Sequence, residues 1–257
     1  MQKQINRHLF LHGEIEQENI LDLIKQIKEI NEYDDAYSEQ IIDAVMELQQ
    51  LGVIDVDYVL EPKREPIVLE INSGGGLVSS GFALISAIEN SATPIIGYVT
   101  GECCSMAITI LASCHYRLGT RYARFMIHEI SGGYIGKIGE MKSYMTEQME
   151  ILAEQYADVL VEYTNMEKKE IIDIFNKNID YWFNPEKAKE YGLLDAIDTE
   201  DISQKDILEK IYAGGEFEPE SKSVNVKEKD MEIDIPIEFS NDIFKDFIVD
   251  EDDLNEE

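Results

Sequence analysis

Short apolar runs alternate with longer amphipathic segments along residues 6–197, and this alternation predicts an α/β domain. Runs of strand character lie at His8–Leu11, Ile67–Ile71, Ile95–Val99 and Phe125–His128, with a closing segment at Leu193–Ile197. Segments with helical spacing lie at Ile15–Ile30, Ser38–Leu51, Leu77–Asn90, Ser105–Cys114, Glu140–Tyr163, Glu167–Asn176 and Glu186–Tyr191. Strand–helix–strand repeats of this length favour a mostly parallel sheet covered by helices.

The last quarter of the chain has a different character. From Asp198 to Glu257 there are 21 acidic and 6 basic residues, which is a net charge of −15 out of −31 for the whole chain. We therefore predict a domain over residues 1–197 and an acidic extension over 198–257. Within the extension, Met231–Phe239 alternates apolar and acidic residues, which predicts a strand that Pro236 confines to a sheet edge. The final run VDEDDLNEE is expected to be solvated.

Composition narrows the classes of function. The net charge of −31 argues against a nucleic-acid partner, because phosphate binding needs a basic face. Apolar residues make up 44% of the chain, enough for a core, yet no apolar run approaches the ~18 residues of a membrane span. Three cysteines cannot form a disulfide framework. We expect a soluble, cytosolic protein with no signal peptide.

The cysteines raise the question of a metal. Cys103 and Cys104 are adjacent, and Cys114 precedes His115, so the set lacks the C-x₂₋₄-C spacing of zinc ligands. Buried thiols packed against a helix of small residues explain them better. The sequence therefore predicts no metal site.

Two polar residues stand where apolar elements end. Ser105 lies at the start of a predicted helix, where free N–H groups stabilise negative charge. Taken alone, the position is better explained by a helix-capping serine or a small core residue. His128 ends a predicted strand, where a neutral imidazole could accept a serine proton. The alternative for His128 is a hydrogen-bonded histidine at a strand edge. Nothing in the composition distinguishes Asp180 among the 53 acidic residues.

A glycine run follows the strand at Ile67–Ile71 and opens a helix. Such a turn, here Ser73-Gly74-Gly75-Gly76, aims backbone N–H groups into one cavity, where they suit a phosphate or an oxyanion. It has neither the Gly-Lys-Ser/Thr ending of a P-loop nor the Gly-x-Gly-x-x-Gly spacing of a dinucleotide turn. A plain tight turn is the alternative.

Taken together, four separated segments resemble the Clp protease proteolytic subunit family. These segments are Ile71–Gly76, Gly101–Met106, Met126–His128 and Asp180–Asp195. The resemblance covers about residues 6–197, and both the order and the spacing of the segments match. It implies that Ser105 is a nucleophile, His128 its general base and Asp180 the carboxylate that orients His128.

The resemblance also assigns the remainder of a peptidase site. It implies that the amides of Gly76 and Met106 bind the oxyanion. It further implies that an extended peptide is held by Gly75, Ile130, Gly132 and Gly133. Of these, Ile130, Gly132 and Gly133 belong to an expected strand over Ile130–Ile138. No cofactor and no metal are implied.

For the architecture, the resemblance implies the spiral of ββα units that this family shares with crotonases, with a projecting handle helix over Glu140–Tyr163. It further implies a homo-oligomeric ring that encloses polypeptide substrates. Along the handle, Met141, Met145 and Met149 recur at helical spacing, which suits burial against a partner and equally suits ordinary core packing.

Several features depart from the family pattern. Gly74 stands where the family has proline, and Cys104 where it has alanine. We expect the family's N-terminal axial hairpin to be absent; the stretch Asn31–Arg64 is longer than its counterpart, and the extension after Ile197 matches no segment of the family. Docking to a Clp-type ATPase therefore transfers poorly, which leaves this partner open, and the features suit a virus- or plasmid-encoded relative acting in a host cytosol. Two alternatives stay open: a crotonase-type acyl-CoA enzyme and a catalytically silent assembly subunit.

Overall fold

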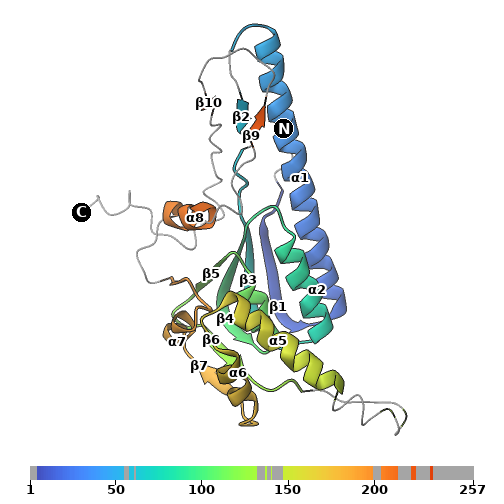
Figure 1. The fold of residues 1–257 in the computed structure, drawn as a ribbon, viewed down its shortest axis with the longest axis vertical. Coiled ribbons are helices and arrows are strands. Elements are labelled where there is room, and N and C mark those ends of the chain that lie inside the picture. Colours follow the sequence, from blue (N-terminus) through green and yellow to red (C-terminus); the bar gives the residue numbers. More distant parts are fainter. Residues whose placement is uncertain are drawn as a thin grey trace, which may run out of the picture.

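The computed structural model describes residues 5–54, 58–60, 62–131, 137, 140, 147–198, 204–213, 221–223 and 232–233. Its strands are β1 (His8–Ile15), β2 (Tyr58–Leu60), β3 (Ile67–Gly76), β4 (Ile95–Cys104), β5 (Tyr116–Gly119), β6 (Arg124–Ile127), β7 (Tyr181–Phe183), β8 (Ala196–Ile197), β9 (Ser221–Ser223) and β10 (Glu232–Ile233). Its helices are α1 (Gln17–Gln50), α2 (Val78–Glu89), α3 (Met106–Ala112), α5 (Met149–Tyr163), α6 (Lys168–Phe175), α7 (Pro185–Glu190) and α8 (Gln204–Ala213). Figure 1 shows their arrangement.

A seven-stranded sheet forms the centre of the molecule. Five strands are ordered β1-β3-β4-β5-β8 and pair in parallel, while β6 pairs in parallel with the last residues of β4. Strand β7 is antiparallel to β6. The run Ile67-Val68-Leu69 is buried on both faces of the sheet, as expected for a strand covered on two sides. The predicted α/β class with a mostly parallel sheet is confirmed.

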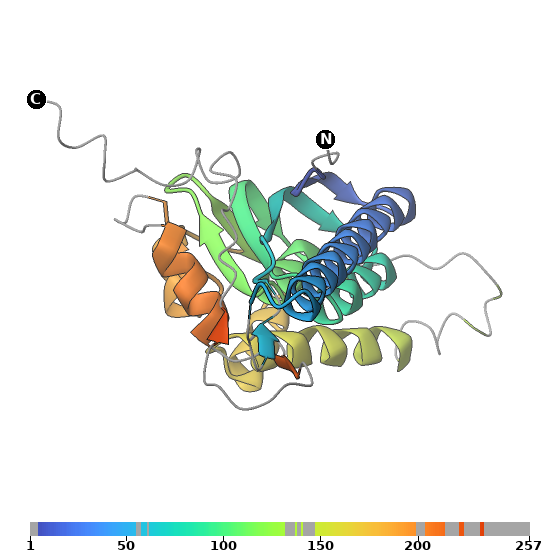
Figure 2. The same cartoon turned by 90° about the horizontal axis from the view of Figure 1, so that it is seen from above.

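The two faces of the sheet are covered by helices from different parts of the chain. Ile67 and Leu69 point into the main core with residues of α1, α2, α3 and α5. Val68, between them, points the other way and packs with Ile207 and Ile211 of α8. Figures 1 and 2 both show α8 on one side of the sheet and α1 with α2 on the other.

One continuous helix replaces the two that the sequence predicts at Ile15–Ile30 and Ser38–Leu51. Its buried positions follow at every third or fourth residue: Ile20, Leu23, Ile27, Ile30, Asp34, Ser38, Ile42 and Val45. The prediction of two helices was wrong because the polar residues between Ile30 and Ser38 do not interrupt the helix. Asp34 is instead buried in an ion pair with Arg7 and accepts a 2.6 Å hydrogen bond from the Thr93 hydroxyl, so its charge is compensated.

The extension contains a helix that the sequence analysis missed. Ile207 and Ile211 of α8 are four residues apart, and Leu208 and Tyr212 follow them, so one apolar side of the helix faces the sheet. Of the strand predicted at Met231–Phe239, the structure describes residues 232–233. They form β10, which pairs in parallel with β2, while β9 pairs antiparallel with β2 from the other side.

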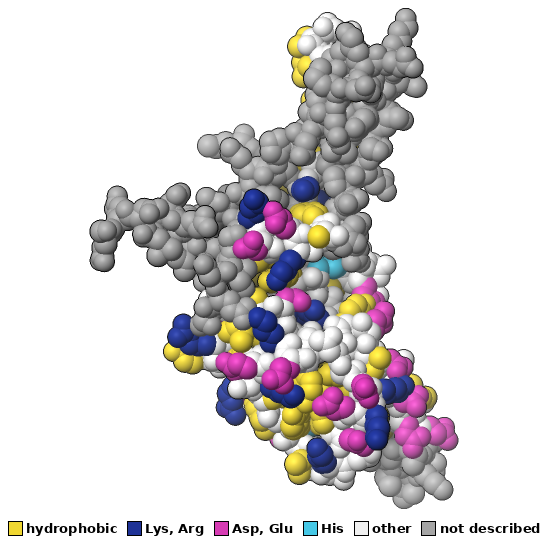
Figure 3. Space-filling view, turned by 60° about the vertical axis from the view of Figure 1, so that its left-hand side comes forward, with side chains coloured by type: hydrophobic (Ala, Val, Ile, Leu, Met, Phe, Trp, Pro, Cys, Tyr) yellow, Lys and Arg dark blue, Asp and Glu magenta, His cyan; other side chains and the backbone are white. Residues whose placement is uncertain are grey.

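The described surface has a mixed charge. On the face drawn in Figure 3, acidic and basic side chains are interspersed, and the described part of that face has no broad Lys/Arg area. Among the described helices, none combines the length and apolar character that a membrane crossing needs.

Candidate active site

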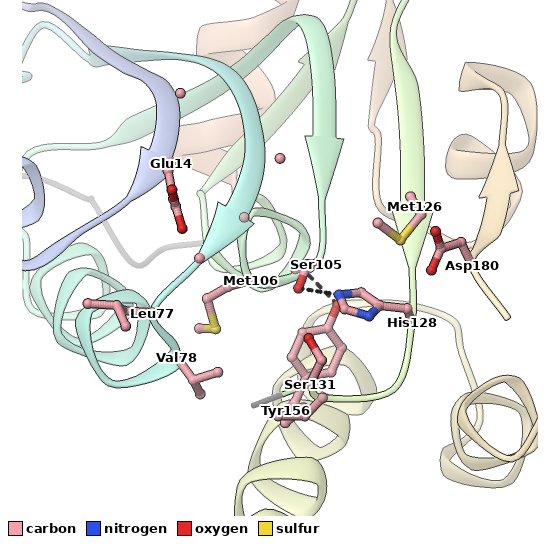
Figure 4. A pocket seen from close by; sticks show the side chains of 15 residues that line it. Glu14, Leu77, Val78, Ser105, Met106, Met126, His128, Ser131, Tyr156 and Asp180 are labelled. Carbon is pink, nitrogen blue, oxygen red and sulfur yellow. Dashed lines mark hydrogen bonds between the residues drawn. The ribbon is translucent and has the colours of Figure 1, made fainter. Parts of the chain in front are cut away.

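Strand register brings the predicted site residues to one edge of the sheet. Strands β4 and β6 are parallel, with Cys104 opposite Met126, so Ser105 and His128 follow at the same carboxyl edge. Strand β7 runs antiparallel to β6, with Tyr181 opposite Ile127, so Asp180 precedes β7 at that edge. Residues that are distant in sequence therefore meet because of main-chain pairing alone (Figure 4).

Ser105 occupies a sharp turn between β4 and α3. Its φ of 53° and ψ of −126° lie outside the regions that residues with a side chain usually adopt. Its N–H donates a 2.8 Å hydrogen bond to the carbonyl of Met126, which extends the β4–β6 pairing into the turn. Backbone strain of this kind persists only where neighbouring contacts impose it, and it is common at functional sites.

The side chains of Ser105 and His128 are hydrogen bonded. The distance from Ser105 Oγ to His128 Nε2 is 2.8 Å, and both residues line a cavity of about 760 Å³. Met106, Ile130 and Tyr156 also line it. A hydroxyl hydrogen bonded to an imidazole at the wall of an open cavity is the arrangement in which a serine can act as a nucleophile.

The glycine turn closes against the serine. A Cβ atom added at Gly75 would lie 2.7 Å from the Ser105 Cβ and 2.7 Å from the Cys104 carbonyl oxygen, so only glycine fits. Gly76 has φ +148° and lies against the backbone of Ile15 in β1. Gly74, in contrast, faces open space.

Met106, the other predicted oxyanion-binding residue, begins α3. Its N–H therefore has no carbonyl partner one turn earlier in the helix. Gly76, like Met106, lines the cavity, so both residues predicted to bind the oxyanion lie in its wall.

Asp180 reaches the site but is not connected to His128. It lines the same cavity, and together with His128 it lines a second, adjoining cavity of about 400 Å³. Among the hydrogen bonds and ion pairs of the described residues, none joins the Asp180 carboxylate to the His128 ring. Figure 4 shows Asp180 on the His128 side of the cavity and Glu14, the second carboxylate of the wall, across from it.

The neighbouring cysteines are poor competitors for the role of nucleophile. Cys103, Cys104 and Cys114 are buried, as the sequence predicts. Burial, followed by the nearby Glu102 carboxylate, raises the pKa of the Cys104 thiol to about 11, and burial raises that of Cys114 to about 12. The thiols are therefore protonated at neutral pH, whereas a reactive cysteine requires the thiolate.

The predicted peptide-binding residues are only partly within the described chain. Gly75 and Ile130 line the cavity, whereas Gly132 and Gly133 lie outside the described residues. Tyr156 of α5, which no sequence pattern indicates, donates a 3.0 Å hydrogen bond from its hydroxyl to the Ser105 carbonyl. No local motif could reveal it, because the contact joins two elements 51 residues apart in sequence.

A serine–histidine pair beside a glycine turn at the carboxyl edge of a parallel sheet is an arrangement found in α/β hydrolytic enzymes. The chain belongs to the Clp protease family, whose match covers residues 26–201. The resemblance and the fold predicted from the sequence are thereby confirmed.

The relatives found are proteolytic subunits. ATP-dependent Clp protease proteolytic subunit 1 of Chlamydia pneumoniae is 35% identical over 144 residues, which are 54% of this chain and 73% of the relative. The same subunit of Chlamydia caviae is 30% identical over 183 residues, 66% of this chain and 94% of the relative. The relatives support a protease role for this chain.

Structure comparison agrees on the fold. The crystal structure of the ClpP protease catalytic domain from Plasmodium falciparum matches with a TM-score of 0.54 and 22% identity, covering 77% of this chain and 86% of that one. At this identity the match concerns the fold alone.

Proposed function

We propose that this chain is a serine endopeptidase that hydrolyses peptide bonds by acyl transfer, with Ser105 as the nucleophile and His128 as the general base. The observation that carries the proposal is the 2.8 Å hydrogen bond between Ser105 Oγ and His128 Nε2 at the wall of an open cavity. Membership of a protease family supports the same chemistry.

The reaction begins when Ser105 Oγ attacks the carbonyl carbon of a bound peptide while His128 Nε2 takes the hydroxyl proton. The C–O bond forms, and the carbonyl π electrons move to the oxygen, which becomes an oxyanion. When the oxyanion re-forms the carbonyl, the C–N bond breaks and the imidazolium returns its proton to the departing amine. Water then attacks the acyl-enzyme with His128 again as base, and this releases the acid and regenerates Ser105.

Backbone amides and one carboxylate complete the proposed machinery. The N–H groups of Gly76 and Met106 would stabilise the oxyanion, and one such donor is typically worth about 3 kcal/mol. Asp180 would accept the proton of His128 Nδ1, which fixes the tautomer that leaves Nε2 free to act as a base. Catalytic hydrogen bonds are often long or unformed before substrate binds, so Asp180 and His128 would come together in the substrate complex.

The proposed substrates are polypeptides bound in extended form along the segment that starts at Ile130, where main-chain pairing would tolerate varied sequences. The proposed assembly is a homo-oligomeric ring that encloses the sites. Relatives bear the name ATP-dependent, but coupling of this chain to a Clp-type ATPase is not part of the proposal, which predicts hydrolysis by the chain alone.

One observation favours a second candidate, a catalytically silent subunit that only builds the assembly. No hydrogen bond joins Asp180 to His128, so the proposed triad is incomplete in this structure. The crotonase-type alternative has no such support, because the family match is to Clp proteases.

Labelling with a fluorophosphonate probe, followed by peptide mapping, distinguishes these functions. We expect one adduct per chain at Ser105, no adduct in Ser105→Ala, and hydrolysis of short fluorogenic peptides by the unmodified protein without ATP. A parallel assay on an unfolded protein, with and without a Clp ATPase, tests the coupling. An assembled chain that neither labels nor hydrolyses peptides would support the silent subunit.

A further inference from the structure

Tyr156 of α5 makes the one side-chain hydrogen bond to the Ser105 backbone among the described residues. Its hydroxyl donates to the Ser105 carbonyl oxygen over 3.0 Å. The side chain is 2% exposed, and its ring packs against Phe175 of α6 at a centroid distance of 5.7 Å. The hydroxyl therefore reaches the turn from a fixed ring rather than from a mobile surface side chain.

The accepting carbonyl belongs to the same peptide group as the Met106 N–H. In a trans peptide the C=O and N–H point in opposite directions, so a bond that fixes the oxygen also fixes the direction of the N–H. Ile108 N–H donates to the same oxygen over 2.9 Å, so the carbonyl has two donors. Donation to a carbonyl also polarises its peptide group and strengthens the N–H on the other side as a donor.

The turn needs such support because Ser105 is in a strained conformation, with φ 53°. On its amino side, the Ser105 N–H is held by the Met126 carbonyl at 2.8 Å. On its carboxyl side, Ile108 holds the carbonyl from within the helix, and Tyr156 is the tie to a separate element. Burial raises the pKa of the Tyr156 hydroxyl, which keeps it a proton donor across the physiological range.

We propose that Tyr156 is a positioning residue that orients and polarises the Ser105–Met106 peptide so that its N–H can bind the oxyanion. This inference rests on the proposed peptidase function. It assigns to α5 a role at the site that no sequence motif indicates. Tyr156 would act on the transition state, where the negative oxygen forms, and not on the binding of the neutral substrate.

The test compares Tyr156→Phe with Tyr163→Phe. Both remove one hydroxyl from α5 and keep the ring. The Tyr163 hydroxyl, however, donates a hydrogen bond to Glu89 of α2, and Tyr163 does not line the cavity. Removal of an oxyanion donor itself costs 10²–10³-fold in kcat, so an indirect effect through the peptide should lower kcat about tenfold for Tyr156→Phe. We expect its KM, and both constants of Tyr163→Phe, to stay within about twofold.

A peptide boronate provides the second measurement. The boron atom forms a covalent bond with Ser105 Oγ, and the tetrahedral adduct places an oxygen in the position of the oxyanion. Tyr156→Phe should therefore weaken inhibition by the same factor by which it lowers kcat. Binding of the peptide substrate to Ser105→Ala should not change when Tyr156→Phe is added.

The outcomes separate this inference from the proposed function. An inactive unmodified protein that does not label with fluorophosphonate would overturn both. An active protein in which Tyr156→Phe keeps kcat within twofold, or changes only KM, would overturn the role of Tyr156 alone. Failure of Tyr156→Phe to fold while Tyr163→Phe folds would assign the hydroxyl to stability and would also overturn it.

Discussion

The carboxyl edge of the main sheet and the face of the sheet beneath α8 are held in place by different forces. At the edge, Ser105 is positioned by a backbone hydrogen bond to Met126 and by a glycine that leaves no room for a methyl group. Beneath α8, Val68 and Ile207 are positioned by apolar burial, which has no directional requirement. Changes at the edge should therefore remove activity at little cost in stability, and changes beneath α8 should do the reverse.

The largest effect is expected for Ser105→Ala. The substitution removes the proposed nucleophile but keeps the backbone contacts of the turn, so peptide hydrolysis should fall by at least about 10³-fold while the fold and the oligomeric state stay unchanged. Steady-state hydrolysis, circular dichroism and light scattering would measure this. Residual activity within tenfold of the unmodified protein would show that another group is the nucleophile.

Asp180→Asn should lower kcat by about 10²-fold or more, because an amide would hold the wrong tautomer of His128. Glu14→Gln is the matched control, since Glu14 is the second carboxylate in the cavity wall and lies across from His128. We expect the control to change kcat by less than about threefold. If Asp180→Asn were as active as the control, a hydrogen bond between Asp180 and His128 would not be needed for catalysis.

Gly75→Ala tests whether the close packing of the glycine turn against Ser105 is needed for activity. The added methyl would lie 2.7 Å from two atoms of the Cys104–Ser105 turn, at a φ of +96° that disfavours alanine, so the turn must shift. A displacement of about 1 Å at a reacting group can cost about 10²-fold in rate, and we expect a loss of that order in kcat. Gly74→Ala is the control, because its methyl would meet nothing within 4 Å. Equal activity in the two variants would contradict the close packing.

The candidate site was largely predictable from the sequence because its motifs are local and their pairing follows from strand order. Ser105, His128, Gly75 and Gly76 each stand at the end of an apolar strand, and parallel strands bring such ends together. The relation between Asp180 and His128 was not predictable, since it depends on side-chain rotation and not on register.

The fold was predicted less well where buried residues are polar or where contacts are distant. The break predicted between two helices does not occur. The helix continues through Asp34, which is buried because it pairs with Arg7, 27 residues away. Helix α8 was not predicted because its apolar residues lie in a strongly acidic part of the sequence. They are recognisable as core residues only once the sheet face that they cover is known. Composition predicts a boundary near Asp198, but it cannot show which surface the following residues contact.

The smallest effect on activity is expected from Ile207→Ala in α8. Ile207 is 1% exposed, and loss of a buried isoleucine side chain typically costs about 2–5 kcal/mol of unfolding free energy. Hydrolysis of a short peptide should stay within about twofold at temperatures where the variant is folded, because Ile207 packs on the face opposite the main core and does not line the cavity. Lys205→Ala, which removes an exposed ion pair with Glu209, should change stability by less than about 1 kcal/mol.

A chain that ends at Ile197 should lose at least as much stability as Ile207→Ala, and it should still cleave the short peptide while it remains folded. Denaturant unfolding and steady-state kinetics on the same samples would measure both quantities. Loss of cleavage by folded Ile207→Ala would show that the face beneath α8 communicates with the carboxyl edge, and the separation between the two regions would then be wrong.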